Sequence, residues 1–264
     1  MEDIENIIKT VYEQTELKWK EIRQYIANTN LDGGKYSIFY NDPYHTLRKG
    51  DIYLVGLNPG GDPTKTNFET EDAIITFKHF KNAFGYNYSA YLDECWGNSA
   101  SELQKGKALH QLRVVDLIGH VSKYLGAFRS VRDVFAANLI FFRTKGKNEL
   151  TELLEKAKKA QILDYCWKWH VRFLEVVRPK IILCNGNAHR LSSYSYVKRF
   201  LDSETTKKEN TRQFGKKSIK YFEAAIQPHE KSLIIGIPHL SYPSLSERNG
   251  GYGVLETIIN EFIE

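Results

Sequence analysis

The first residues that could do chemistry follow a short apolar run. Ile52 to Gly56 is apolar or small, and residues 58–62 then read Asn-Pro-Gly-Gly-Asp. The side-chain amide of Asn58 can both donate and accept hydrogen bonds, and the glycines let backbone N–H groups approach a ligand closely. Pro59 biases Asn58 away from the helical region. This loop could therefore bind a polar ligand, and an ordinary strand-to-loop turn is the alternative.

A second polar loop follows the last apolar run of the chain. That run covers residues 232–237, and His239 comes two residues after it. In open α/β sheets, ligands bind outside the carboxyl ends of the strands, so both loops are candidate site segments. Asn138 lies within a third apolar run, where its amide must find hydrogen-bond partners because a buried polar group without them is costly.

The elements that must position these residues can be read from the apolar pattern. Four runs are typical of buried strands, at residues 52–56, 136–142, 180–185 and 232–237. Helical spacing is found at residues 99–124, 150–177, 188–201 and 253–262. Strands that alternate with helices predict a mostly parallel sheet covered on both faces. We therefore expect a three-layer α/β/α fold with a central, mostly parallel four-stranded sheet. Residues 36–40 are expected to form a short strand and residues 213–222 a hairpin or a paired edge strand.

The domain organisation follows from helical spacing and from the lack of linkers. Residues 1–35 are expected to be a helical N-terminal extension packed on the core. Residues 36–264 are expected to form one α/β domain, because no Pro-, Gly- or Ser-rich linker divides them.

Composition places the chain among globular proteins. It has 264 residues, of which 42% are hydrophobic, and no apolar run approaches the roughly 18 residues of a membrane span. The acidic N-terminus lacks the apolar core of a secretion signal. The three cysteines are scattered without a CxxC pair, which favours a reducing compartment. We expect a cytoplasmic or nucleoid-associated monomer with no membrane contact.

The charge balance mildly favours an anionic partner. Lys and Arg total 37 against 32 Asp and Glu, which gives a net charge of +5. Six of the basic residues gather between positions 207 and 220, around the expected hairpin. Such a run could contact nucleic acid, and a solvated protein surface is the alternative.

The segment Gly56-Leu57-Asn58-Pro59-Gly60 and the later His239/Pro243-Ser244-Leu245-Ser246 loop resemble two motifs of the uracil-DNA glycosylase superfamily. In that family the first motif follows the first strand and the second follows the last strand. Asn138 also matches an Asn of the family's second strand, and residues 178–187 resemble its third-strand segment. The resemblance covers residues 51–263. The branch that carries an iron–sulfur cluster is not supported, because its four cysteines are missing.

The second motif departs from the family pattern. His239 is followed by Leu-Ser-Tyr before Pro243-Ser244, so either His239 or Tyr242 could occupy the place of the family histidine. We favour His239 because it lies closer to the end of the strand.

The resemblance implies a DNA glycosylase that acts in base excision repair without a metal or cofactor. It would flip a damaged, mismatched or modified base, uracil-like by default, out of duplex or single-stranded DNA and hydrolyse its N-glycosidic bond. Asn58 would position the water, with Asp62 as an alternative base, and His239 would donate to the departing base. Gly56 and Leu57 would line the base site, where Asn138 would read the base's edge.

The resemblance also implies contacts with the base face and with DNA. Phe68 would stack on the base, with a core position as the alternative. Leu245 and Arg248 could fill the space that the base leaves, and ordinary loop packing is the alternative for Leu245. The DNA-binding set comprises Ser244, Leu245, Ser246, Arg248, Lys216 and Lys217.

Two other classes of function stay open. The chain could be a catalytically silent relative that binds modified DNA, because its second motif is divergent and position 58 lacks a carboxylate. It could also hydrolyse a small nucleoside or nucleotide in the same pocket.

Overall fold

The computed structural model describes residues 3–26, 36–60, 87–96, 104–126, 129–201, 208–227, 230–242 and 245–264. These residues are built around a six-stranded sheet with the order β2-β1-β3-β6-β5-β4. The strands are β1 (Ile52–Gly56), β2 (Phe135–Asn138), β3 (Ile181–Asn185), β4 (Asn210–Phe214), β5 (Lys217–Gln227) and β6 (Glu230–Ile237).

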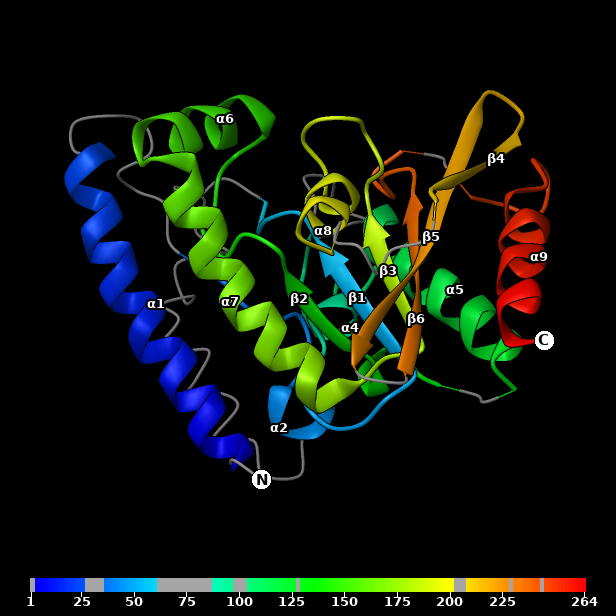
Figure 1. Cartoon of the computed structure of the whole chain (residues 1–264), viewed down its shortest axis with the longest axis horizontal. Helices are drawn as coiled ribbons and strands as arrows, with labels where there is room; N and C mark the ends of the chain where they lie inside the picture. Colours follow the sequence, from blue (N-terminus) through cyan, green and yellow to red (C-terminus); the bar gives the residue numbers. More distant parts are fainter. Residues whose placement is uncertain are drawn as a thin grey trace.

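Strands and helices share the chain, so the expected α/β class is confirmed. The sheet is mixed and has six strands, so the expected number of four is wrong. Strands β2, β1, β3 and β6 run parallel to one another. The hairpin of β4 and β5 continues the same sheet, because β5 pairs antiparallel with β6 along most of its length. The four apolar runs account for β1, β2, β3 and β6, and the hairpin expected around residues 213–222 supplies β4 and β5. In Figure 1 the arrowheads of β1, β3 and β6 point to the end of the molecule that also carries the β4–β5 turn.

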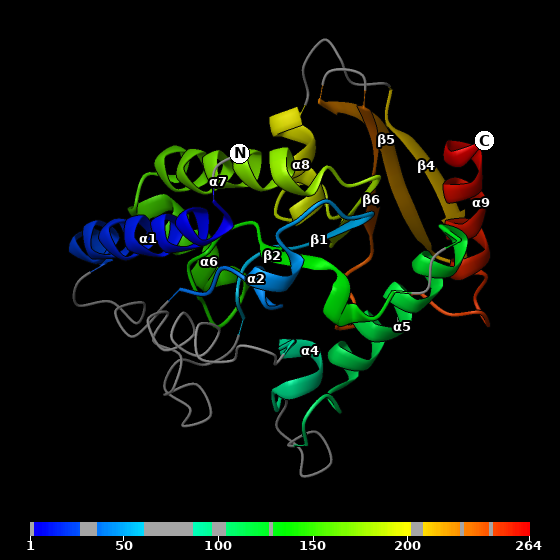
Figure 2. The same cartoon turned by 90° about the horizontal axis from the view of Figure 1, so that it is seen from below.

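Helices cover both faces of the sheet, as Figure 2 shows from below. One face packs against α1 (Ile4–Ile26), α6 (Lys147–Lys156), α7 (Lys159–Val177) and α8 (Ser193–Leu201). The other face packs against α4 (Ala90–Asp93), α5 (Leu109–Tyr124), the 3-10 turn η2 (Val131–Asp133) and α9 (Gly251–Ile263). Successive side chains of a strand point to opposite faces, and β1 follows this rule. Tyr53 and Val55 lie in the α7-side core, whereas Ile52 and Leu54 lie in the α5-side core.

The N-terminal segment forms one continuous helix in its described part. Helix α1 buries Ile8, Val11 and Ile22 at helical spacing, and these residues join the α7-side core. The short helix α2 (Pro43–Thr46) follows further along the chain and is capped by Asp42, whose carboxylate accepts a hydrogen bond from the Tyr44 N–H. Within the described part of the chain, no helix combines the length and apolar character needed to cross a bilayer.

Three local predictions differ from the structure. The expected helix 150–177 is two helices, α6 and α7, which meet at Lys158 in a left-handed conformation with φ 54°. Strand β2 ends at Asn138, although Leu139 to Phe142 are also buried. Residues 36–40 make isolated antiparallel bridges to the β2 segment, Tyr36 to Phe142 and Phe39 to Ala137. Residues 36–40 and 139–142 are apolar because they are buried, although they do not form regular strands.

Candidate functional site

Four polar or small residues lie at the carboxyl edge of the sheet on its α5 side. Each follows by two positions a strand residue of the α5-side core: Gly56 follows Leu54, Asn138 follows Ala136, Asn185 follows Leu183, and His239 follows Ile237. Gly56 pairs with Asn138 across β1 and β2, and Asn185 pairs with Ile237 across β3 and β6. Because neighbouring strands are about 4.8 Å apart and β3 separates β1 from β6, the ends of β1 and β6 are about 10 Å apart.

The hydrogen bonds of Asn58 fix the orientation of its side-chain amide. Its Nδ2 donates to the backbone carbonyl of Pro59 at 3.1 Å and to Oγ1 of Thr144 at 2.9 Å. The Thr144 hydroxyl donates in turn to the carbonyl of Gly146, so it accepts from Asn58. A carbonyl can only accept, and therefore Nδ2 must face Pro59. The Oδ1 atom of Asn58 accepts from no described residue, which leaves an acceptor available for a water molecule.

The backbone around Asn58 is held by the segment that follows β2. The N–H groups of Leu139 and Ile140 donate to the carbonyls of Gly56 and Leu57, both at 2.8 Å. Further along, the Thr144 N–H donates to the Pro59 carbonyl at 3.2 Å, and the Arg143 guanidinium donates to the Gly60 carbonyl. Both Arg143 and Thr144 are buried. Residues 57–60 after β1 are therefore held in place before any ligand binds, and the sequence interpretation missed Arg143 and Thr144, which contribute to this.

Asn138 finds the partners that its buried position demands. Its Nδ2 donates to the Ser37 carbonyl at 3.1 Å, and its Oδ1 accepts from the Tyr40 hydroxyl. A Cβ atom added to Gly56 would lie 3.2 Å from the Tyr40 ring and 3.3 Å from Oδ1 of Asn138. Tyr40 therefore covers Gly56 and Asn138, two of the four residues that the resemblance assigned to the base. Of the four hydrogen-bonding positions of the Asn138 amide, one Nδ2 hydrogen and one Oδ1 lone pair have no partner among the described residues.

His239 presents a proton on Nε2. The Ser241 N–H donates to Nδ1 of His239 at 3.2 Å, so Nδ1 carries the lone pair and the neutral ring carries its hydrogen on Nε2. The side chain is exposed, although neighbouring groups remove part of its hydration and lower its pKa below the usual 6.5. The neutral, donating form therefore persists at pH 7 and somewhat below.

Asn185 and helix α5 hold the loop that carries His239. Oδ1 of Asn185 accepts from the Leu240 N–H at 3.0 Å, and the Arg113 guanidinium donates to the Leu240 carbonyl at 2.8 Å. Nδ2 of Asn185 donates to Nε2 of His110 at 3.0 Å. Burial, with smaller contributions from His239 and Arg113, lowers the pKa of His110 to about 4, so this acceptor stays unprotonated at neutral pH.

Aromatic rings join the two halves of the edge. The centroids of Tyr40 and Trp96 are 6.0 Å apart, those of Trp96 and His110 are 5.8 Å apart, and those of His110 and His239 are 5.4 Å apart. Tyr91 contacts both Tyr40 and Trp96. This row of rings offers an aromatic surface next to the polar groups. Phe68, which the sequence interpretation assigned to stacking, lies outside the described residues, as does Asp62.

No protein-family model and no curated protein matches this chain. Among the described residues, no group of three or more His, Cys, Asp or Glu side chains is placed to hold a metal ion. The site is therefore interpreted from its own geometry.

The residues assigned to DNA contact are divided by the structure. Leu245 is only 8% exposed and lies in the α5-side core, so its loop-packing alternative describes its position. The Ser246 hydroxyl accepts from the Asn249 N–H at 3.3 Å and stabilises the turn before α9, while Arg248 is exposed. Tyr242 is 70% exposed in the His239 loop. Ser244 lies outside the described residues.

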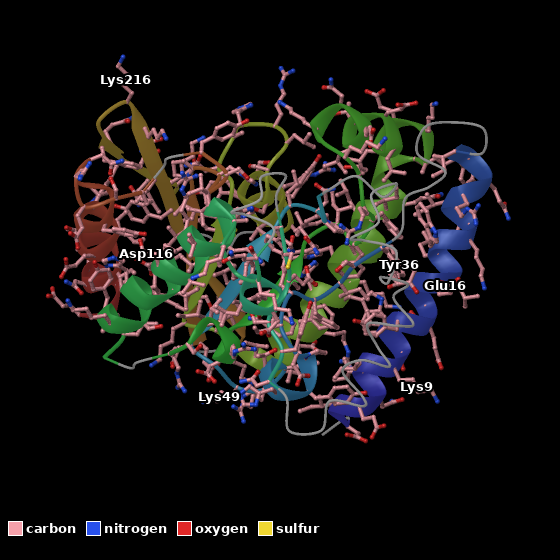
Figure 3. The ribbon with its side chains drawn as sticks, turned by 180° about the vertical axis from the view of Figure 1, so that it is seen from behind. Lys9, Glu16, Tyr36, Lys49, Asp116 and Lys216 are labelled. Atoms are coloured by element: carbon pink, nitrogen blue, oxygen red, sulfur yellow. The ribbon has the colours of Figure 1, made fainter. Side chains whose placement is uncertain are left out.

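The basic hairpin tip lies at the same end of the molecule as His239. Lys220 pairs with Gly236 in the antiparallel register of β5 and β6, which places the β4–β5 turn level with the residues that follow β6. Lys216 is exposed at this turn, and Lys217 is half-buried beside it. Figure 3 shows Lys216 projecting from the tip. Leu57, assigned to the base site, instead packs partly against the α7-side core.

Only weak sequence signals mark the residues that hold the His239 loop in place. Asn185 follows the third apolar run as Asn58 follows the first, and this pattern could have marked it as a site residue. His110 and Arg113 lie on an ordinary helical stretch, and nothing in their spacing distinguishes them from surface residues.

Proposed function

We propose that this protein is a DNA glycosylase similar to the uracil-DNA glycosylase superfamily, hydrolysing the N-glycosidic bond of a flipped, uracil-like base. The observation that carries the proposal is a pair of preset groups at the carboxyl edge of the sheet. Among the described residues, Oδ1 of Asn58 after β1 accepts no hydrogen bond, and Nε2–H of His239 after β6, the last strand, donates none. The ends of β1 and β6 are separated by about 10 Å with β3 between them, so a base lying across the end of β3 could reach both loops.

His239 would stabilise the departing base. Cleavage of an N-glycosidic bond places negative charge on the base and positive charge on the sugar, as in other oxocarbenium-like transition states. A donor fixed in place before the reaction stabilises such a charge without reorganisation. The contacts of Asn185 and Arg113 with Leu240 support this role, because they hold the backbone beside His239.

Asn58 would orient the attacking water through Oδ1. An amide cannot take up a proton as a carboxylate does, so this arrangement predicts slower chemistry than an enzyme with Asp at the same position. Substrates whose base departs as a stable anion would suit it best.

The surroundings of the edge are compatible with DNA. Three exposed side chains in the loops near this edge of the sheet could contact phosphates or bases: Lys216, Arg248 and Tyr242. A base must leave the duplex to reach the edge, which costs a few kcal/mol and favours mismatched or damaged bases.

Base release from labelled oligonucleotides containing uracil, hydroxymethyluracil or hypoxanthine tests the proposal, in duplex and single-stranded form. We expect wild type to release a base, and we expect Asn58→Ala and His239→Ala each to lower kcat by about 10²-fold or more. Tyr242→Ala is the matched control for the histidine assignment. A large loss in Tyr242→Ala with none in His239→Ala would transfer the donor role to Tyr242. No release from any of these substrates would refute the proposed activity.

A catalytically silent binder of modified DNA is the second candidate, favoured by the contacts of Asn138. Its amide is already bonded to Ser37 and to Tyr40, and the Tyr40 ring lies over Gly56. Salt-sensitive affinity for modified duplex without base release would support this candidate. Absence of DNA affinity, with release of base from a free nucleoside or nucleotide, would instead favour a small-molecule hydrolase.

A further inference from the structure

A cavity of about 390 Å³ lies at the opposite end of the sheet from the candidate site. It lies at the amino ends of three parallel strands and is lined by residues 49–51 before β1, residues 178–180 before β3 and residues 230–232 at the start of β6. Arg129 and Ile226 complete the lining. Figure 3 shows Lys49 at the end of the molecule away from Lys216. The volume of this cavity lies in the range of roughly 300–1,000 Å³ that is typical of small-molecule sites.

The lining carries a clear excess of positive charge. Five basic side chains (Lys49, Arg129, Arg178, Lys180 and Lys231) face two carboxylates (Asp51 and Glu230). Asp51 is bonded to both Arg129 and Lys180, at 3.2 Å each, and these two cations hold its pKa below the usual value despite its partial burial. These ion pairs hold Arg129 and Lys180 beside Asp51. The other three cations of the lining are Lys49, Arg178 and Lys231.

Two of the cations have no acidic partner among the described residues. Lys49 makes no ion pair with them, and the guanidinium of Arg178 donates, among these residues, only to the backbone carbonyl of Glu175. Lys231 has a weak contact of 4.0 Å with Glu223, and its side chain is 63% exposed. Unpartnered Lys and Arg side chains around one cavity are a recurring means of binding phosphate.

The helix that ends at this cavity does not account for the charge. Helix α7 ends at Val177, and its carboxyl end carries the equivalent of about half a negative charge. This half charge is small beside the excess of positive over negative side chains in the lining. The floor is neutral, because the buried Ser232 hydroxyl donates to the Pro179 carbonyl at 2.6 Å and keeps its oxygen as an acceptor.

Arg178 occupies a backbone position that favours glycine. It caps α7 in the left-handed region with φ 47°, where a side chain costs about 1 kcal/mol. Glycine is the usual residue at such a helix end. The chain therefore has an arginine at a position where backbone geometry alone would favour glycine.

We propose that this cavity binds a small molecule with adjoining phosphate groups, such as inorganic pyrophosphate or the diphosphate of a nucleotide. Lys49 and Arg178 contact the phosphates from the rim, and Arg129 and Lys180 contact them from the wall. The proposal is independent of the glycosylase activity and uses none of the residues at the carboxyl edge.

Isothermal titration calorimetry of the full chain tests the proposal, with inorganic pyrophosphate, adenosine diphosphate and adenosine as probes in the absence of divalent metal. We expect pyrophosphate and adenosine diphosphate to bind, adenosine not to bind, and the Kd of both phosphates to rise with salt. Lys49→Ala and Arg178→Gly should each raise the Kd by about tenfold.

Arg178→Gly separates lost binding from lost folding, because glycine suits the left-handed conformation and should keep or raise the Tm. Lys9→Ala, which changes an exposed lysine of α1 that is paired with Glu13, is the matched control and should leave the Kd unchanged. Wild type that binds neither phosphate, or a Lys49→Ala/Arg178→Gly variant that binds as wild type does, would overturn the proposal. Loss of oligonucleotide affinity in that variant, with no pyrophosphate binding by wild type, would assign the cavity to a nucleic-acid backbone and overturn it too.

Discussion

The side chain of Asn185 accepts a hydrogen bond from the backbone N–H of Leu240, 3.0 Å away and next to His239. Asn185 ends β3, whereas Leu240 lies beyond the end of β6, so the bond ties the His239 loop to a strand of the sheet. Arg113 holds the carbonyl of the same residue from α5. Under the proposed function, Asn185 is thus a positioning residue for His239.

Replacing Asn185 with alanine should lower the kcat of base release even under conditions where the variant stays folded. The change leaves the Leu240 N–H without its partner, which costs about 1–3 kcal/mol, and frees the loop that carries His239. We expect kcat to fall by about tenfold or more at a temperature where the variant stays folded. Single-turnover kinetics and thermal unfolding measure the two effects separately.

Asn187→Ala is the control for this prediction. Asn187 lies two residues further on and donates to the carbonyls of Ser218 and Gly236, which are contacts between strands. Its loss should lower Tm and leave kcat of the folded protein unchanged. Equal kcat in Asn185→Ala and wild type would contradict the positioning role.

Stability should fall as the pH drops from about 6.5 to about 4, because buried histidines are neutral in the folded state. Burial lowers the pKa of His170 from 6.5 to about 4. Its Nδ1 accepts from the Tyr53 hydroxyl, and its Nε2–H donates to the Leu139 carbonyl at 3.1 Å. Between these pH values the unfolded chain binds a proton that the folded chain does not. Its contribution, roughly 3 kcal/mol, is complete above pH 6.5 and is lost toward pH 4.

His170→Gln tests this pH dependence, because glutamine can accept and donate as His170 does but does not titrate. Urea unfolding at pH 7.5 and pH 5 should show a smaller loss of unfolding free energy in the variant than in wild type. A loss of the same size in both proteins would mean that other groups cause the acid sensitivity. His110 shares the lowered pKa and should account for part of the remaining loss.

The fold class could be predicted from the sequence because burial leaves a direct trace in residue type. Each of the four apolar runs overlaps a strand, and the loops after β1 and β6 lie at the same edge, as the parallel arrangement requires. The size of the sheet could not be predicted in this way. Strands β4 and β5 are partly exposed and charged, so no continuous apolar run marks them as parts of the central sheet.

The candidate site was predictable where residue type and strand ends coincide, as for Asn58, Asn138 and His239. Its supporting contacts were not, since they join residues distant in sequence. Thr144 contacts Asn58 across 86 positions, and Tyr40 contacts Asn138 across 98. Leu245 illustrates the reverse case. A hydrophobic residue in a polar loop is compatible with either exposure or burial, and only packing against α9 decides between them.

Gly236→Ala should strongly destabilise the protein, because the α8 layer packs directly on this position of β6. A Cβ atom there would lie 2.4 Å from the ring of the buried Tyr194, closer than nonbonded atoms can approach. Tyr194 or the strand must therefore move, and we expect a loss of about 3 kcal/mol or more in the free energy of unfolding. Chemical unfolding followed by circular dichroism measures it.

Gly253→Ala provides the matched opposite case. Gly253 lies on the exposed side of α9, and a Cβ atom there would have no neighbour within 4 Å. Alanine favours a helix interior over glycine by roughly 0.5–1 kcal/mol, so this variant should be slightly more stable than wild type. If Gly236→Ala instead matched wild type in stability, the close packing of α8 on β6 would be wrong. That result would also remove the reason for a glycine three positions before His239, in the strand that leads to the candidate site.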